Sequence, residues 1–204
     1  MRTILFLSIL SAFVFTGCGG NDQQATTDEA GSLTTTGVYA AAATALEAGK
    51  GPAVVSQLLM DNFQAVSDSS TGALNVLVSQ DFVAMATQLA DKYPNDTLAA
   101  MPLYRAAEVV RAMNDPKRTA AIYQKVNSSY PTFSKAPEAL FMLGFTYDED
   151  LGDLEKAKAV YTDFLQKHPT HSFADDTQML LENLGKSDEE ILKELEKKAG
   201  QQQQ

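Results

Sequence analysis

Hydrophobic residues recur with helical spacing through most of the chain. In the clearest stretch they stand three or four positions apart, at Leu140, Leu143 and Tyr147. After Gly152 and Asp153 the same spacing resumes at Leu154, Ala157, Tyr161 and Phe164. Apolar residues at such intervals line one side of an α-helix. The pattern therefore predicts two amphipathic helices joined by a short acidic turn.

Three dipeptides punctuate this helical pattern, each an aromatic residue or histidine followed by proline: Tyr93-Pro94, Tyr130-Pro131 and His168-Pro169. The prolines at positions 94, 131 and 169 lie 37 and 38 residues apart. A hydroxyl residue suited to N-cap a helix follows three positions after each proline, at Thr97, Ser134 and Ser172. Such regular spacing is typical of stacked repeats, which we expect over residues 94–184.

One glycine lies inside a predicted helix, where glycine costs about 1 kcal/mol relative to alanine. This residue, Gly144, follows the apolar Leu143. A glycine retained at that cost indicates a close approach by the partner helix. We expect Ala157, on the second helix of the same repeat, to make that contact.

Residues 37–93 are predicted to form an N-terminal helical region. Its first part, residues 37–67, is rich in Ala and Leu and is broken at residues 49–52, where Gly, Lys, Gly and Pro follow one another. Residues 73–93 then supply a helix that precedes the repeats.

The chain after the last proline pair is also predicted to be helical, over residues 172–184. Gly185 is suited to end that helix, and Ser187 with Glu190 forms a capping box for the next one. We therefore expect a C-terminal capping helix over residues 185–200, followed by a polar tail at 201–204.

The chain begins with a targeting segment. After Met1 and Arg2, residues 4–17 form an uncharged and mostly apolar run, which is shorter than the roughly 20 residues of a membrane span. The run leads into the only cysteine, Cys18. Residues 1–17 resemble a bacterial lipoprotein signal, which implies cleavage before Cys18 and acylation of its thiol by fatty acids such as palmitate. The alternative is an ordinary cleaved signal with Cys18 near the cut by chance.

Residues 18–36 are polar and rich in Gly, Thr and Gln, without apolar periodicity. They are predicted to form a flexible tether between the lipid and the folded part. Gly19 stands where an aspartate would resemble an inner-membrane retention signal. The expected location is therefore the outer membrane, with the lipid-anchored chain facing the periplasm.

Charge and composition narrow the function further. Of 204 residues, 26 are acidic and 16 basic, giving a net charge of −10 at pH 7, which argues against a nucleic-acid partner. A single cysteine excludes an intrachain disulfide, and two histidines leave few options for a metal site. We expect no catalytic, cofactor-binding or metal site, and hence no enzyme.

Three motifs that suggest other chemistry are better explained by the helices. Gly185-Lys186-Ser187 lacks the earlier glycine of a phosphate-binding loop. The aspartates of residues 148–153 lack the glycine and glutamate of a calcium-binding EF-hand at the required positions. His168 and His171 lie near two aspartates, but His168 occupies the slot that tyrosine fills in the other two copies. It is therefore interpreted as a turn residue.

Residues 136–169 are similar to a tetratricopeptide repeat (TPR), a helix–turn–helix unit. The family pattern is met, with one extra residue in the turn, by Leu140, Leu143, Gly144, Tyr147, Ala157, Tyr161 and Pro169. Residues 99–131 resemble a degenerate copy that keeps Leu103, Ala107, Tyr123 and Pro131. The resemblance implies an all-α fold, a tandem TPR-like α-solenoid closed by the C-terminal capping helix.

In this family the first helix of each repeat lines a groove that holds a peptide or a partner's helix. Carried over by position, the groove residues are Met101, Tyr104, Glu108, Arg111, Glu138, Phe141, Phe145 and Asp148. Acidic groups flank the two phenylalanines, so the expected partner carries Lys or Arg beside apolar anchors. The alternative for Phe141 and Phe145 is that they pack against the neighbouring first helix.

The sequence thus favours a lipid-anchored scaffold or adaptor of the cell envelope that binds a partner protein or peptide through a TPR-like groove. The alternative is a surface-exposed lipoprotein that captures a small ligand or a host protein.

Overall fold

The computed structural model describes residues 37–201, which form helices without a β-sheet in this range. The α-helices are α1 (Ala40–Glu47), α2 (Pro52–Asp61), α3 (Val76–Lys92), α4 (Ala100–Ala112), α5 (Pro116–Ser129), α6 (Ala136–Phe145), α7 (Leu154–Lys167), α8 (Ala174–Asn183) and α9 (Asp188–Gln201). Shorter turns are the 3₁₀ helices η1 (Phe63–Val66) and η2 (Thr97–Ala99), and the π-helical turn η3 (Thr146–Asp150).

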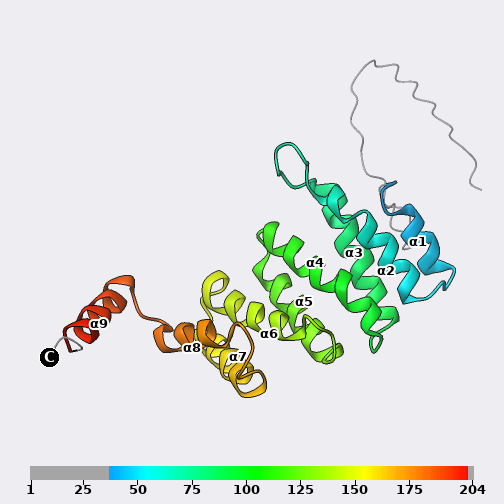
Figure 1. Cartoon of the computed structure of the whole chain (residues 1–204). Coiled ribbons are helices and arrows are strands. Elements are labelled where there is room, and N and C mark those ends of the chain that lie inside the picture. Colours follow the sequence, from blue (N-terminus) through cyan, green and yellow to red (C-terminus); the bar gives the residue numbers. More distant parts are fainter. Residues whose placement is uncertain (1–36, 202–204) are drawn as a thin grey trace, which may run out of the picture. The chain divides into compact units, whose positions relative to one another are not determined.

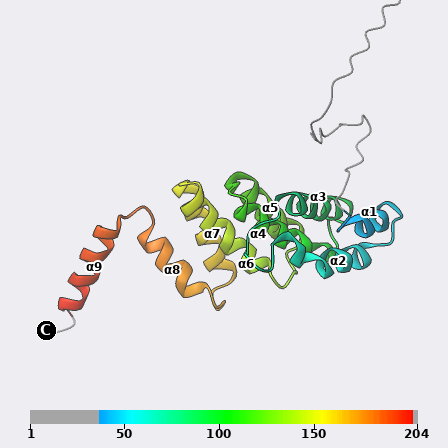
Figure 2. The ribbon, with the colours of Figure 1, turned by 90° about the horizontal axis from the view of Figure 1, so that it is seen from above.

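Each helix from α1 to α8 packs against the next one along the chain (Figure 1). The same succession is visible from a second direction in Figure 2. One hydrophobic core runs through these pairs, from Tyr39 before α1 to Phe164 on α7. The all-α stack of helix pairs predicted from the periodicity is therefore confirmed.

The spacing of the proline pairs marks structurally equivalent helix ends. Tyr93, Tyr130 and His168 are the C-cap residues of α3, α5 and α7, with φ of −130°, −130° and −132° and ψ of 63°, 58° and 52°. Each donates its backbone N–H to the carbonyl four residues earlier. The pattern found in the sequence is therefore a true structural repeat.

The expected hydroxyl caps are wrong. The N-cap residues of α4, α6 and α8 are Ala99, Lys135 and Phe173, and none of them makes a side-chain cap. Around each proline the chain makes two successive four-residue turns, as in the hydrogen bonds from Phe133 N–H to Tyr130 O and from Ala136 N–H to Phe133 O. Because these turns delay the start of the helix, Thr97, Ser134 and Ser172 all fall before the cap position.

Gly144 lies at a close helix contact, as predicted, but its partner is not Ala157. A Cβ on Gly144 would stand 2.6 Å from both Cδ1 and Cε1 of Tyr161. Tyr161 is fully buried, and its ring fills the space that the missing side chain leaves. Ala157 lies one turn earlier on α7 and is also buried.

The flanking regions form the predicted helices. Residues 48–51 separate α1 from α2, and Gly49 and Gly51 there have φ of 64° and 87°. Gly185, with φ of 76°, follows α8. Ser187 and Glu190 then form the reciprocal capping box of α9, because Glu190 N–H donates to Ser187 Oγ and Ser187 N–H donates to Glu190 Oε2. Along the chain, the last two helices that pack extensively against each other are α7 and α8. Helix α9 does not pack extensively against any of the other described helices.

The predicted signal, Cys18 and the tether fall outside the described residues, as does most of the polar tail. Among the helices of residues 37–201, none has the length and apolar character needed to cross a membrane.

Candidate functional site

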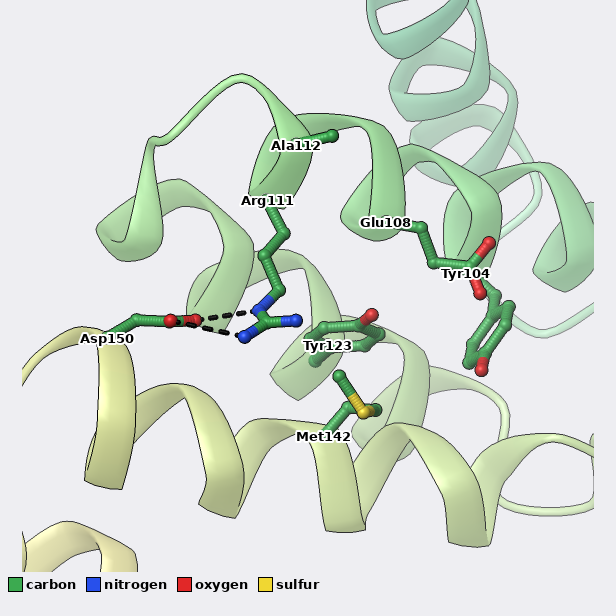
Figure 3. A pocket seen from close by; sticks show the side chains of 7 residues that line it. All are labelled: Tyr104, Glu108, Arg111, Ala112, Tyr123, Met142 and Asp150. Carbon is green, nitrogen blue, oxygen red and sulfur yellow. Dashed lines mark hydrogen bonds and ion pairs between the residues drawn. The ribbon is translucent and has the colours of Figure 1, made fainter. Parts of the chain in front are cut away.

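A cavity of about 430 Å³ opens between α4, α5, α6 and the π-helical turn (Figure 3). We call it the Arg111 cavity; it is lined by Tyr104, Glu108, Arg111, Ala112, Tyr123, Met142 and Asp150. The first four belong to α4, whose successive turns bring them to one side of the helix. Its volume falls in the range of sites that hold a small molecule or the side chains of a peptide.

Arg111 and Asp150 form a two-point ion pair across this cavity. Nε of Arg111 lies 2.8 Å from Oδ2 of Asp150, and its Nη2 lies 3.2 Å from Oδ1 (Figure 3). The guanidinium also lies over the ring of Phe145, 5.1 Å from its centroid. The hydrogen bonds that Arg111 donates to Asp150 raise the pKa of Arg111 above its ordinary value. The pair therefore fixes the end of α4 relative to the turn that follows α6.

Aromatic rings form the other wall of the cavity. The rings of Tyr104 and Tyr123 meet edge to face with centroids 5.9 Å apart, and Tyr104 meets Phe133 in the same way at 6.4 Å. Tyr123 has no exposed surface, and burial raises the pKa of its hydroxyl well above the ordinary value. Because Tyr123 is held by the core, it forms a fixed floor, while Tyr104 is half-buried and open to a ligand.

The comparison with known families identifies the helix pair that carries one side of this cavity. Residues 138–171, which span most of α6, the π-helical turn and α7, match the tetratricopeptide repeat family. The chain carries a tetratricopeptide repeat. No curated protein and no solved structure matches the chain.

Of the groove residues predicted from the TPR resemblance, three meet in the cavity. They are Tyr104, Glu108 and Arg111, all on α4. Phe145 on α6 joins them through its contact with the Arg111 guanidinium. Such grooves bind proteins in this repeat class, and a TPR domain implies protein partners in general.

The acidic residue that the second repeat contributes to the Arg111 cavity is Asp150 and not the expected Asp148. The turn after α6 is π-helical, so it accommodates an extra residue and changes which side chain faces α4. Asp148 instead accepts a hydrogen bond from the Tyr161 hydroxyl at 3.3 Å. Burial raises the pKa of Asp148, in part offset by that hydrogen bond.

Phe141 packs inside the TPR and does not line the cavity. Its ring centroid lies 4.7 Å from that of Phe173, 6.1 Å from that of Phe164 and 6.4 Å from that of Tyr161. These rings come from α7 and from the residue before α8. Phe141 therefore packs mainly on the second helix of its own repeat, whereas Phe145 contacts both Phe141 and Arg111, which lies on the neighbouring first helix α4.

The predicted groove residues Met101 and Glu138 do not line the Arg111 cavity. Met101 is half-buried against the core. The Glu138 side chain is 16% exposed and pairs with Lys135 at 2.8 Å, with Nε2 of His171 at 3.9 Å from its other oxygen. Glu108 pairs with Arg105 at 2.7 Å. The acidic flank predicted from the sequence is thus partly neutralised by neighbouring cations.

Sequence reasoning missed Ala112, Tyr123, Met142 and Asp150. Tyr123 belongs to α5, the second helix of its pair, whereas the TPR resemblance places the groove on first helices. Met142 follows Phe141 directly, so the helical rotation of about 100° per residue separates the two faces. A signal for Asp150 was present in the extra residue of the turn, which indicates a local change in helical rotation.

The two histidines lie together near the start of α8. Their rings are 6.5 Å apart, and both contact Phe164, at 5.5 Å for His168 and 5.6 Å for His171. Burial lowers the pKa of His168 below its ordinary value. Within residues 37–201, no group of three or more His, Cys, Asp or Glu residues is arranged to hold a metal ion.

Proposed function

We propose that this chain is a lipid-anchored scaffold or adaptor of the bacterial cell envelope that binds a partner protein or peptide in the Arg111 cavity. The observation that carries the proposal is the position of this cavity, between the matched TPR and the helix pair before it. The half-buried Tyr104 and the side chain of Met142 offer apolar contact there. The proposed role is binding, with no chemical step.

The charges that line the cavity favour a basic partner segment. Two carboxylates, from Glu108 and Asp150, line it with one guanidinium, from Arg111. Asp150 is paired with Arg111, and Glu108 is paired with Arg105, so a basic group of the partner would replace Arg105 at Glu108. The whole chain carries a net charge of −10, which adds to the negative potential. A Lys or Arg beside an apolar anchor would therefore find a complementary surface.

The partner site is tested by filling the cavity from its edge. Ala112 is exposed at the end of α4, so Ala112→Leu obstructs the cavity without disturbing the core. A photo-crosslinking amino acid placed at Glu108 in living cells captures the partner, which mass spectrometry identifies. Binding of the purified partner is then compared between the wild type, Ala112→Leu and Ala159→Leu, a control at an exposed site on α7.

We expect Ala112→Leu to weaken binding by about 30-fold, the effect of losing a contact of about 2 kcal/mol, while Ala159→Leu leaves it unchanged. Binding is also expected to weaken as salt rises. Equal affinity of the two variants for every captured partner would refute the site.

The lipid anchor and the outer-membrane location rest on the sequence around Cys18. Replacing Cys18 by serine removes the thiol that would be acylated. We expect the Cys18→Ser protein to stay unprocessed or to leave the outer-membrane fraction, as shown by fractionation and by labelling with a clickable palmitate analogue. A variant that matures and fractionates like the wild type would rule out the anchor.

A further inference from the structure

A second cavity, of about 440 Å³, lies on a different side of α5 from the Arg111 cavity. Its α5 wall consists of residues at positions i, i+3, i+4 and i+7, namely Lys117, Ala120, Ala121 and Gln124. Residues at these intervals share one face of a helix. We call this space the Lys117 cavity.

The interior of the Lys117 cavity is apolar. Ala120 and Ala121 present only methyl groups, and these small side chains leave the space unfilled. Tyr147 and Leu151, both half-buried, line it from the TPR. The cavity thus offers a flat methyl surface from α5 and an aromatic ring from the TPR, an arrangement suited to a planar or short apolar group.

The rim of this cavity is positive, unlike the chain as a whole. Lys156 pairs with Asp153 at 2.6 Å, and its ammonium lies 5.3 Å from the centre of the Tyr147 ring. Asp153 is committed to this pair and to the backbone N–H of Lys156, contacts that lower its pKa, so its charge is balanced. Lys117 is exposed and makes no ion pair with any described residue. The three charged groups sum to one excess positive charge.

The π-helical turn places residues at both cavities. The backbone N–H of Leu151 bonds to Thr146 O at 3.0 Å, and that of Asp153 bonds to Tyr147 O at 2.7 Å. This widened turn directs Asp150 to the Arg111 cavity while Tyr147 and Leu151 line the Lys117 cavity. Single π-helical turns are found frequently at functional sites. Here the turn contributes lining residues to both the Arg111 cavity and the Lys117 cavity.

We propose that the Lys117 cavity binds a small organic carboxylate with an aromatic or short aliphatic body. The apolar body lies between the methyl groups of Ala120 and Ala121 and the ring of Tyr147, and the carboxylate pairs with Lys117. The carboxylates of Glu149 and Asp150 line a neighbouring cavity with Asn114 and Pro116 and not this one. The proposal does not depend on the partner proposed for the Arg111 cavity.

The test uses 4-phenylbutyrate as the probe and its neutral amide, 4-phenylbutanamide, as the matched control. Each compound is titrated into the detergent-solubilised full chain labelled with ¹³C in its alanine methyl groups. An aromatic ring seated in the cavity shifts the methyl resonances of Ala120 and Ala121, which report the position of binding as well as its affinity.

We expect saturable shifts of these two methyl resonances with the carboxylate and weaker binding of the amide. Lys117→Gln should weaken carboxylate binding by about fivefold, the upper range for an exposed ion pair. Ala121→Leu fills the cavity from an exposed position and should abolish the shift of Ala120, while Ala159→Leu leaves it intact. A melting curve of each variant verifies folding.

The proposal would be overturned by the absence of a saturable shift at millimolar probe, by equal affinity for acid and amide, or by unchanged binding to folded Ala121→Leu. Shifts confined to alanines elsewhere in the chain would overturn it as well, because they would place the probe at another site.

Discussion

The contact between Gly144 and Tyr161 makes a sharp prediction about the packing of the TPR. Gly144→Ala adds one methyl group, whose carbon would stand 2.6 Å from two atoms of the Tyr161 ring. The ring has little freedom to withdraw, because Tyr161 is fully buried, its hydroxyl bonds to Asp148 at 3.3 Å, and Phe141 packs beside it. The added methyl therefore forces α6 and α7 apart.

Two effects of opposite sign decide the outcome. Alanine in place of a helical glycine stabilises a helix by about 1 kcal/mol. Overpacking of a filled core costs about 1 to 3 kcal/mol. Because the Tyr161 ring is held by Asp148 and by Phe141, we expect a cost near the upper limit of that range. The net expectation is a loss of about 2 kcal/mol in the free energy of unfolding. For a protein of this size that lowers the melting temperature by about 4 to 8 °C.

A double-mutant cycle separates the two effects. Tyr161→Val removes the ring atoms that a Cβ at position 144 would meet. In that background Gly144→Ala is expected to stabilise the chain, because only the helix propensity remains. Urea unfolding followed by circular dichroism measures all four proteins, and the expected coupling energy is about 3 kcal/mol. If Gly144→Ala is neutral or stabilising in the wild type, or equally destabilising in both backgrounds, the close-contact argument is wrong.

Two further predictions concern a helix cap and a buried hydroxyl. The Asp115 side chain caps α5 by accepting the backbone N–H of Arg118 at 3.1 Å, so Asp115→Ala should lower the free energy of unfolding by about 1 kcal/mol in urea titrations, and Asp115→Asn by much less. Burial raises the pKa of Tyr130 from 10.0 to about 12, so its unfolded form loses the proton first, and stability should fall as pH rises from 10 to 12. Tyr130→Phe should show a smaller fall over that interval in urea titrations at each pH, and an identical fall would show that Tyr130 does not contribute.

The sequence predicted the helices well because their ends carry strong local signals. Tyr93, Tyr130 and His168 each stand before a proline, and proline disfavours the helical conformation of the preceding residue. Helix ends were therefore found by spacing alone. Helix starts were not, because Ser134 and Ser172 are separated from the true start by backbone turns that no side chain announces.

Part of the Arg111 cavity could be predicted from the sequence, because a regular helix fixes the direction of each side chain and the π-helical turn changes it. Tyr104, Glu108 and Arg111 were placed together because α4 is a regular helix, so their spacing fixes their direction. In the second repeat the π-helical turn changes the rotation after Phe145, so Asp150 takes the place expected for Asp148. The proposed roles of Cys18 and of the envelope location concern residues outside the described range and stay predictions.

The hydroxyl of Tyr130 has a consequence for how cooperatively the helix pairs fold. It donates to the carbonyl of Ala90 at 3.2 Å and to that of Tyr93 at 3.1 Å, so it joins the end of α5 to the end of α3. The equivalent residue at the end of α7 is His168, which contacts Phe164 and His171 through its ring. The helix pair that ends in α5 is therefore coupled more tightly to the pair before it than the helix pair that ends in α7 is. In hydrogen exchange, opening should begin at α7 and α8 and spread towards α3, so the proposed partner would bind where slow-opening and fast-opening segments meet.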